Sequence, residues 1–247
     1  MNYIVLDLEF NQYFPFRSEA KSSSNPNCPF EIIQIGAVKL DDTLTVYDSF
    51  NSYIKPQLYK RIHPYVGKIT GITIKQLNHA PLFSEVFTEF AHFAGAEGSV
   101  LCTWGKDDIK SLFKNILYFG QDPELITDKY INVQKYATSY FNTCSGTSIG
   151  LKNAAAQLNL NMDLTFHNAL NDATYTAEIF KEVASENIEP EIFDFNDLSC
   201  KKTPSRINYH ALGEHFENLL ERKLTKEEMA LIKSAYKLGE SKTFRRK

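Results

Sequence analysis

Two acidic residues stand close together in an apolar run near the start of the chain. Residues 3–10 read YIVLDLEF and contain Asp7 and Glu9. The run is typical of a buried β-strand, on which alternate side chains share a face, so both carboxylates point the same way. Two like charges at this spacing in a core are unfavourable unless one is protonated or a cation neutralises them. The pair therefore predicts a metal site, for which other parts of the chain must supply ligands.

A second pair of acids occurs in residues 103–113, TWGKDDIKSLF. On a helix, Asp107 shares a face with Lys110, where acidic residues usually form surface pairs. Asp108 aligns instead with Leu112, at the edge of the apolar stripe. Because ligand sites on open sheets gather at the carboxyl ends of strands, Asp108 is the better candidate ligand. A shift of one residue in helix phase would favour Asp107.

The third candidate group lies in residues 167–180, HNALNDATYTAEIF. Small residues form the packing face of a long helix, and Asp172 lies beside that face in the first turns. His167 is five residues earlier, about 140° away on a continuous helix, which places it in the preceding loop. There its side chain can approach whatever Asp172 binds. A histidine in isolation is more often a surface or capping residue, so its neighbours carry this interpretation.

The elements that must position these residues follow from the hydrophobic periodicity. Strands are expected at 3–9, 31–40, 44–54, 100–104 and 130–134, and helices at 84–94, 109–117, 149–158 and 168–186. Residues 41–43 predict a hairpin turn, and residues 11–30, with three prolines and a serine run, predict a long loop. Three strands followed by alternating helices and strands predict an α/β fold with a mixed five-stranded sheet flanked by helices.

The chain is expected to hold two parts. With 247 residues, 43% of them hydrophobic and 23% charged, it has the composition of a globular protein with one large domain and an appendage. We place the domain at residues 1–190 and a mainly helical C-terminal extension at 191–247. In the extension, TKEE at 225–228 is a capping-box pattern, and we expect the helix to run to about Leu238 and end at Gly239.

Charge is distributed unevenly between the two parts. Residues 1–198 contain 15 Lys and Arg against 24 Asp and Glu, a net charge of −9, whereas residues 199–247 carry +6. A basic end is common in proteins that bind a polyanion, although many solvated tails are basic as well. The basic residues that would contact a nucleic-acid backbone are Lys201, Lys202, Arg206 and residues 244–247.

Other features bear on location. No apolar stretch approaches the ~20 residues of a membrane helix, and the first strand starts too early to leave room for a signal peptide. The four cysteines are far apart, with no CxxC pair. We therefore expect neither a zinc site nor a disulfide framework, no membrane association, and a cytoplasmic location.

The three motifs occur in an order that resembles one nuclease family. Asp7-Leu8-Glu9, Asp108 and His167-x4-Asp172 together resemble the DEDDh 3′–5′ exonucleases, the DnaQ-like branch of the RNase H-like superfamily. The stretches EIIQIGAVKL, TGIT, APLFSEV and GLKNAAAQLNL are similar as well, and the resemblance covers roughly residues 1–188. The sequences DLEF and TWG look most like the KapD and ERI-like subgroup. The resemblance implies an RNase H-like fold.

The resemblance also implies a mechanism. In this family two divalent ions, Mg²⁺ or Mn²⁺, lie about 3.5–4 Å apart and clamp the scissile phosphate. By this resemblance, Asp7 would bridge both ions, and Glu9 and Asp172 would hold the ion that activates water. Asp108 would help to hold the second ion. His167 would be the general base, a role for which histidine is suited at neutral pH.

Contacts with the substrate are expected from Leu8, Phe10 and Trp104. Phe10 alternates away from Glu9 and is equally consistent with a core position, and Trp104 with a packing position at a strand end. Four residues of the loop after the first motif are also candidates for stacking on bases or holding phosphate: Tyr13, Phe14, Phe16 and Arg17. Loop aromatics also often pack only against their own domain.

Two functional hypotheses remain. The first is a metal-dependent 3′–5′ exonuclease that removes nucleoside 5′-monophosphates from the 3′ ends of single-stranded RNA or DNA. ERI-like resemblance favours RNA. The second is a regulatory module that keeps the fold and binds nucleic acid or protein, an alternative that stays open because KapD-like proteins are named for an inhibitory role in sporulation. A structural domain without a site would make the five polar residues a coincidence and is set aside.

Overall fold

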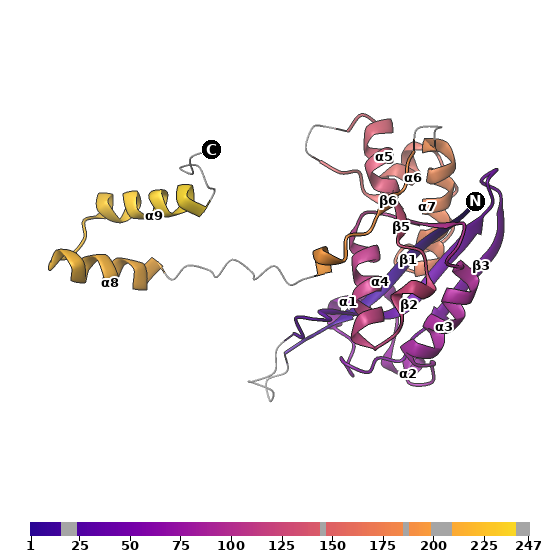
Figure 1. The fold of residues 1–247 in the computed structure, drawn as a ribbon, viewed down its shortest axis with the longest axis horizontal. Coiled ribbons are helices and arrows are strands. Elements are labelled where there is room, and N and C mark those ends of the chain that lie inside the picture. Colours follow the sequence, from indigo (N-terminus) through magenta and orange to yellow (C-terminus); the bar gives the residue numbers. More distant parts are fainter. Residues whose placement is uncertain (16–23, 144–146, 185–187, 199–208, 241–247) are drawn as a thin grey trace. The chain divides into compact units, whose positions relative to one another are not determined.

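The computed structural model of the chain describes residues 1–15, 24–143, 147–184, 188–198 and 209–240 (Figure 1). The chain divides into two compact units, Met1–Ser199 and Cys200–Lys247. Some residues singled out in the sequence lie outside the described residues: Phe16, Arg17, Lys201, Lys202, Arg206 and residues 244–247. Within the described residues, no helix is both long enough and apolar enough to cross a bilayer.

The first unit is built on one mixed sheet of six strands. They are β1 (Asn2–Gln12), β2 (Phe30–Leu40), β3 (Val46–Tyr53), β4 (Ser99–Thr103), β5 (Lys129–Asn132) and β6 (Glu191–Ile192), in the order β3-β2-β1-β4-β5-β6. The strands β1, β4 and β5 run parallel to one another, and the remaining neighbours are antiparallel. The carboxyl ends of β1 and β4 therefore meet at one edge of the sheet.

Helices cover both faces of this sheet (Figure 1). They are α1 (Pro64–Thr70), α2 (Ile74–Leu77), α3 (Phe83–Ala94), α4 (Asp107–Tyr118), α5 (Val133–Tyr140), α6 (Leu151–Gln157) and α7 (Ala169–Val183), with 3-10 turns η1 (Pro123–Leu125) and η2 (Phe195–Leu198). Successive side chains of β1 point to opposite faces of the sheet. Leu6 and Leu8 pack in one core cluster with α3 and α4, whereas Val5 packs in another with α5, α6 and α7. Asp7 and Glu9 share the side of Val5.

Most expected elements are confirmed, and the mixed α/β sheet flanked by helices is present. The expected number of strands was wrong, because β6 adds a sixth strand of only two residues, too short to leave an alternating pattern. It pairs with β5. The carboxylate of Glu191 also forms salt bridges with Lys106 Nζ at 2.9 Å and with Lys135 Nζ at 3.1 Å. Residues 133–134, expected to continue a strand, instead begin α5.

The described residues of the second unit form two helices, α8 (Tyr209–Leu220) and α9 (Lys226–Glu240). The expected capping box is present, since Thr225 Oγ1 accepts from the backbone N–H of Glu228 at 3.2 Å and Glu228 accepts from that of Thr225 at 2.9 Å. The expected end of the helix at Gly239 was wrong, because α9 continues through it to Glu240. A single glycine weakens a helix interior by only about 1 kcal/mol and does not have to end it.

Candidate active site

The first two candidate ligands lie near the carboxyl end of β1. Asp7 is half-buried and pairs across the sheet with Gly36, and Glu9 is buried and pairs with Gln34. The next pair is Phe10 with Ile32, so a bulge in β2 follows Glu9 directly. A bulge bends the strand and changes the direction of the side chains beside it, and bulges are common next to active sites.

Gly36 allows helix α7 to approach these carboxylates. A Cβ atom at position 36 would overlap the backbone of Ala169 and Leu170, the first two residues of α7. The backbone N–H of Ala169 also donates to the side chain of Gln34 at 3.4 Å. The N-terminus of α7 thus rests directly on β2 beside Asp7 and Glu9, which brings the first turns of this helix into the site.

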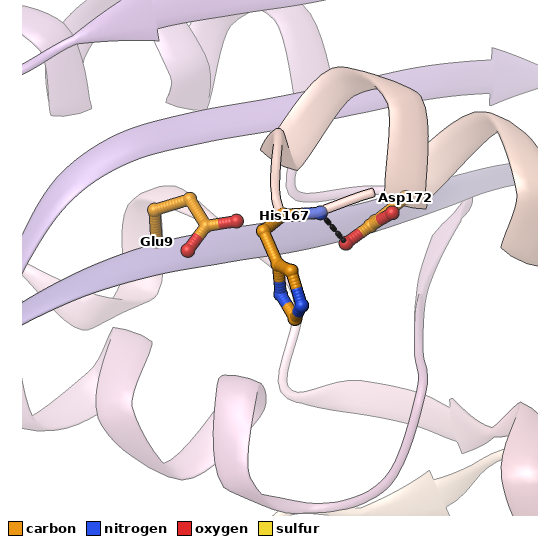
Figure 2. A group of neighbouring side chains, drawn as sticks. All are labelled: Glu9, His167 and Asp172. Carbon is orange, nitrogen blue, oxygen red and sulfur yellow. Dashed lines mark hydrogen bonds between the residues drawn. The ribbon is translucent and has the colours of Figure 1, made fainter. Parts of the chain in front are cut away.

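His167 and Asp172 are joined across the start of α7 (Figure 2). Asn168 caps the helix by accepting from the backbone N–H of Asn171, and His167 lies just before it, as expected, with a left-handed φ of 62°. The backbone N–H of His167 donates to Asp172 Oδ2 at 3.0 Å. This bond fixes the carboxylate of Asp172 while the imidazole of His167 remains exposed and extends away from the bond.

The chain brings Glu9, His167 and Asp172 together in an arrangement that fits a metal ion. One ligand atom from each of the three lies within 4.8 Å of the others. The second carboxylate oxygen of Asp172, Oδ1, is buried and has no hydrogen-bond partner among the described residues, which is costly unless a cation or proton satisfies it. Carboxylate oxygens suit hard cations such as Mg²⁺ and Mn²⁺.

Asp108 is the fourth acidic residue near this site, and it lies on α4, on the face of the sheet that carries Leu6 and Leu8. It is buried in the first turn of α4, whereas Asp107 is exposed. Burial raises the pKa of Asp108 most, followed by the charges of Asp107, Glu9 and Asp172. The pKa of Asp7 is raised by burial first and then by the charge of Asp108. The helix phase that the sequence favoured for Asp108 is therefore the one observed, and its side chain lies close enough to the other acids to interact with them.

Burial and mutual repulsion shift the titration of all four carboxyl groups. Burial, followed by the charges of neighbouring acids, raises the pKa of Glu9 to about 7 and that of Asp108 to about 8, and holds the pKa of Asp7 well above its usual range. Burial also raises the pKa of Asp172, against the opposing effect of the hydrogen bond from His167. Four acids with raised pKa values in one place are typical of a functional site.

The expected substrate contacts lie in different surroundings. Leu8 is buried in the core, so only its backbone is available to a substrate. Phe10 packs at the edge of the same core, 6.1 Å from the Phe30 ring, and lines a pocket. Trp104 packs against the other core cluster, and its buried indole N–H meets no acceptor in the part of the chain that the structure describes. Tyr13 lies 6.4 Å from Tyr59, between ring centroids.

A positioning feature beside the site had no clear signal in the sequence. Asn11, two residues after Glu9, is fully buried and binds the backbone of Tyr59, Arg61 and His63 at 2.8 to 2.9 Å. Polar residues within a strand pattern were interpreted as the start of a loop. The structure instead uses one of them to hold a distant segment against the end of β1.

Comparisons with known proteins identify the family to which this fold belongs. The family model for the RNase T group, described as exonuclease, matches residues 4–180. A probable 3′–5′ exonuclease, KapD, of Bacillus subtilis (strain 168) is 27% identical over 184 residues, covering 74% of this chain and 84% of KapD. The DNA polymerase III epsilon subunit of Aquifex aeolicus (strain VF5) is 26% identical over 193 residues, covering 74% of this chain and 81% of its own length.

A solved structure shows the same fold. The nuclease domain of 3′hExo, a DEDDh family member bound to rAMP, superposes with a TM-score of 0.63 at 22% identity. The match covers 78% of this chain and 96% of that domain.

Proposed function

Because the chain belongs to the RNase T family of exonucleases and is a DEDDh-type 3′–5′ exonuclease, we propose that it acts on single-stranded 3′ ends and releases nucleoside 5′-monophosphates. We further propose that RNA is preferred to DNA, and that the enzyme works in the cytoplasm. The observation that carries the proposal is the group of Glu9, His167 and Asp172, in which a buried carboxylate oxygen has no hydrogen-bond partner within residues 1–15, 24–143, 147–184, 188–198 and 209–240.

The acidic residues supply the binding site for two divalent ions, Mg²⁺ or Mn²⁺. Asp7 and Glu9 lie on β1, Asp172 lies on α7 and Asp108 lies on α4. The proposed ligands therefore come from the central strand and from a helix on each face of the sheet. When bound, such ions stabilise negative charge on a phosphoryl group and lower the pKa of water. The raised pKa values of the four acids mean that bound cations also replace protons that the cluster otherwise holds.

His167 acts as the general base in this proposal. Its imidazole is exposed, while its backbone N–H is held by Asp172, so the ring can reach a water molecule beside that carboxylate. The imidazole takes the proton of this water as its oxygen attacks the scissile phosphorus. The bond to the 3′ oxygen of the upstream nucleotide breaks, and the terminal nucleotide leaves with a 5′-phosphate.

The test compares the full chain with Asp7→Asn and with Asp163→Asn, a matched change at an exposed acid outside the cluster. Each protein receives 5′-labelled and 3′-labelled single-stranded RNA and DNA, with Mg²⁺, Mn²⁺ or EDTA. We expect a shortening ladder from the 5′ label, release of mononucleotides from the 3′ label, and loss of both with Asp7→Asn or EDTA only. Binding of either strand without shortening would overturn the proposal in favour of a regulatory module.

A further inference from the structure

A pocket is formed by residues of β1, β2 and α4 that are close in sequence to two of the acidic residues. Its volume is about 430 Å³, and its lining includes Phe10, which follows Glu9, and Asp107, which precedes Asp108. The pocket therefore draws its lining from the two elements, β1 and α4, that also carry Glu9 and Asp108, although neither of these acids lines it. We call it the α4 pocket.

The lining of the α4 pocket combines two aromatic rings and two lysines with the carboxylate of Asp107. Phe10 and Phe30 form an aromatic wall, and Lys110 and Lys114 contribute their side chains from one face of α4. Both lysines are half-buried, and neither forms an ion pair with a described residue. An aromatic wall with nearby cations is the combination by which proteins hold single-stranded nucleic acid, bases on the rings and phosphates on the cations.

The first unit is acidic overall, so Lys110 and Lys114 supply positive charge that a bound nucleic acid would need. Residues 1–198 carry a net charge of −9, which repels a polyanion. A substrate strand that reaches the acidic cluster needs local cations to offset that repulsion. Lys110 and Lys114 lie one turn apart on the helix that also carries Asp108.

The direction of α4 indicates which part of the substrate meets these cations. Lys110 and Lys114 are two and six residues beyond Asp108, about 3 and 9 Å further along the helix axis. The terminal nucleotide carries only one phosphate, the scissile one, which belongs at the acidic cluster. Further phosphates exist only in the upstream strand.

We propose that the α4 pocket binds the upstream nucleotides of a single-stranded substrate, with their phosphates on Lys110 and Lys114 and a base against Phe10 and Phe30. This inference rests on the proposed exonuclease function and adds a selection for unpaired ends, because a base must leave its helical stack to reach the aromatic wall.

The experiment compares Lys110→Gln/Lys114→Gln with the charge-matched control Lys129→Gln/Lys181→Gln. Lys129 starts β5 at the opposite end of the parallel strands, and Lys181 lies near the end of α7. Two substrates are used: a ten-nucleotide single strand, and the p-nitrophenyl ester of thymidine 5′-phosphate, in which a small leaving group replaces the upstream strand.

We expect the pocket variant to raise the KM for the ten-nucleotide strand by about tenfold. The dependence of log KM on log salt concentration should become shallower by about 1.4, or ~0.7 for each lost phosphate contact. Hydrolysis of the ester should stay within twofold, and the control should behave as wild type. Equal loss on both substrates, or no loss on either, would overturn the proposal.

A binding measurement separates this proposal from the proposed function. The fluorescence anisotropy of a labelled ten-nucleotide strand is followed with Ca²⁺ in place of the activating metal. If wild type hydrolyses neither substrate, the exonuclease function fails. A tenfold weaker affinity of the pocket variant would still support the α4 pocket as a nucleic-acid site, and equal affinities would exclude it.

Discussion

Asn11 and Glu31 lie directly opposite each other on β1 and β2, and both bind the backbone of the same distant segment. Asn11 accepts from His63 and donates to Tyr59 and Arg61, while Glu31 accepts from residues 57–59 at 2.5 to 2.8 Å. Both side chains are buried. The pair fastens this segment to the end of β1 beside Glu9.

Removal of this pair should destabilise the fold non-additively. Glu31→Ala leaves three backbone N–H groups without an acceptor, for which we expect a loss of about 2–4 kcal/mol in the free energy of unfolding. Because both residues hold Tyr59, the double variant with Asn11→Ala should differ from the sum of the single changes by about 0.5–3 kcal/mol. Urea denaturation measures both effects, with exposed Glu89→Ala as control. Additive losses would show that the two residues act independently.

Gly36→Ala should disrupt the site more than its small size suggests. The added methyl group would overlap the backbone of Ala169 and Leu170, so α7 must shift and carry Asp172 with it. We expect a loss of about 1–3 kcal/mol in stability and a larger relative loss of exonuclease activity. Gly150→Ala is the matched control, because a Cβ there meets no atom within 4 Å. Normal activity in Gly36→Ala would contradict the importance of this close approach.

The stability of the metal-free protein should depend on pH in an unusual direction. The folded-state pKa is about 7 for Glu9 and about 8 for Asp108, above the ~4 of unfolded carboxyl groups. The folded state therefore binds more protons than the unfolded state, and stability falls as pH rises from about 4 to 8. The loss should amount to several kcal/mol, because both groups lose protons that the folded state holds more tightly than the unfolded state.

Thermal denaturation in EDTA at several pH values measures this loss. Mg²⁺ or Mn²⁺ should restore stability most strongly at the upper end of the range, where the acids are deprotonated. Glu9→Gln should flatten the profile. A metal-free protein that becomes more stable between pH 5 and 8 would contradict the raised pKa values.

Asp108→Asn and Asp107→Asn should have very different effects. Asp108 is buried and interacts with the acidic cluster, so its loss should lower kcat by at least about a hundredfold, equivalent to about 2.7 kcal/mol of charge stabilisation. Asp107 is exposed, and its replacement should leave kcat within a few-fold. Steady-state kinetics with a 5′-labelled strand compares the two variants. Similar kcat values would remove Asp108 from the proposed ligand set.

His167→Asn isolates the role of the imidazole. Asparagine tolerates the left-handed φ of 62° at this position, so the hydrogen bond from residue 167 to Asp172 should be kept. Loss of a general base should lower kcat by about 10²–10⁴-fold with little change in melting temperature. The pH dependence of kcat and circular dichroism melting give the two readouts. A variant with full activity would require another base.

Local patterns in the sequence predicted the long helices and strands and the direction in which individual acidic side chains point. Alternation in β1 and helical spacing in α4 and α7 are local properties, so the shared face of Asp7 and Glu9 and the inward position of Asp108 follow from short windows. Glu9 and Asp172 are separated by 162 residues of intervening chain, and only the family resemblance indicated that they lie close together. The support from Asn11 and Gly36 was missed, because it comes from contacts with segments distant in sequence.

The shortest strand has a practical consequence for fragments of this protein. β6 pairs with β5 at the edge of the sheet, and Glu191 bridges Lys106 and Lys135 there. A fragment that stops at Pro190 would leave the hydrogen-bonding groups of β5 open to other chains, as unprotected sheet edges are. It would also lose the buried Phe193 ring, 4.7 Å from Phe113 between centroids. Such a fragment should self-associate, whereas one that continues through Leu198 keeps the edge closed.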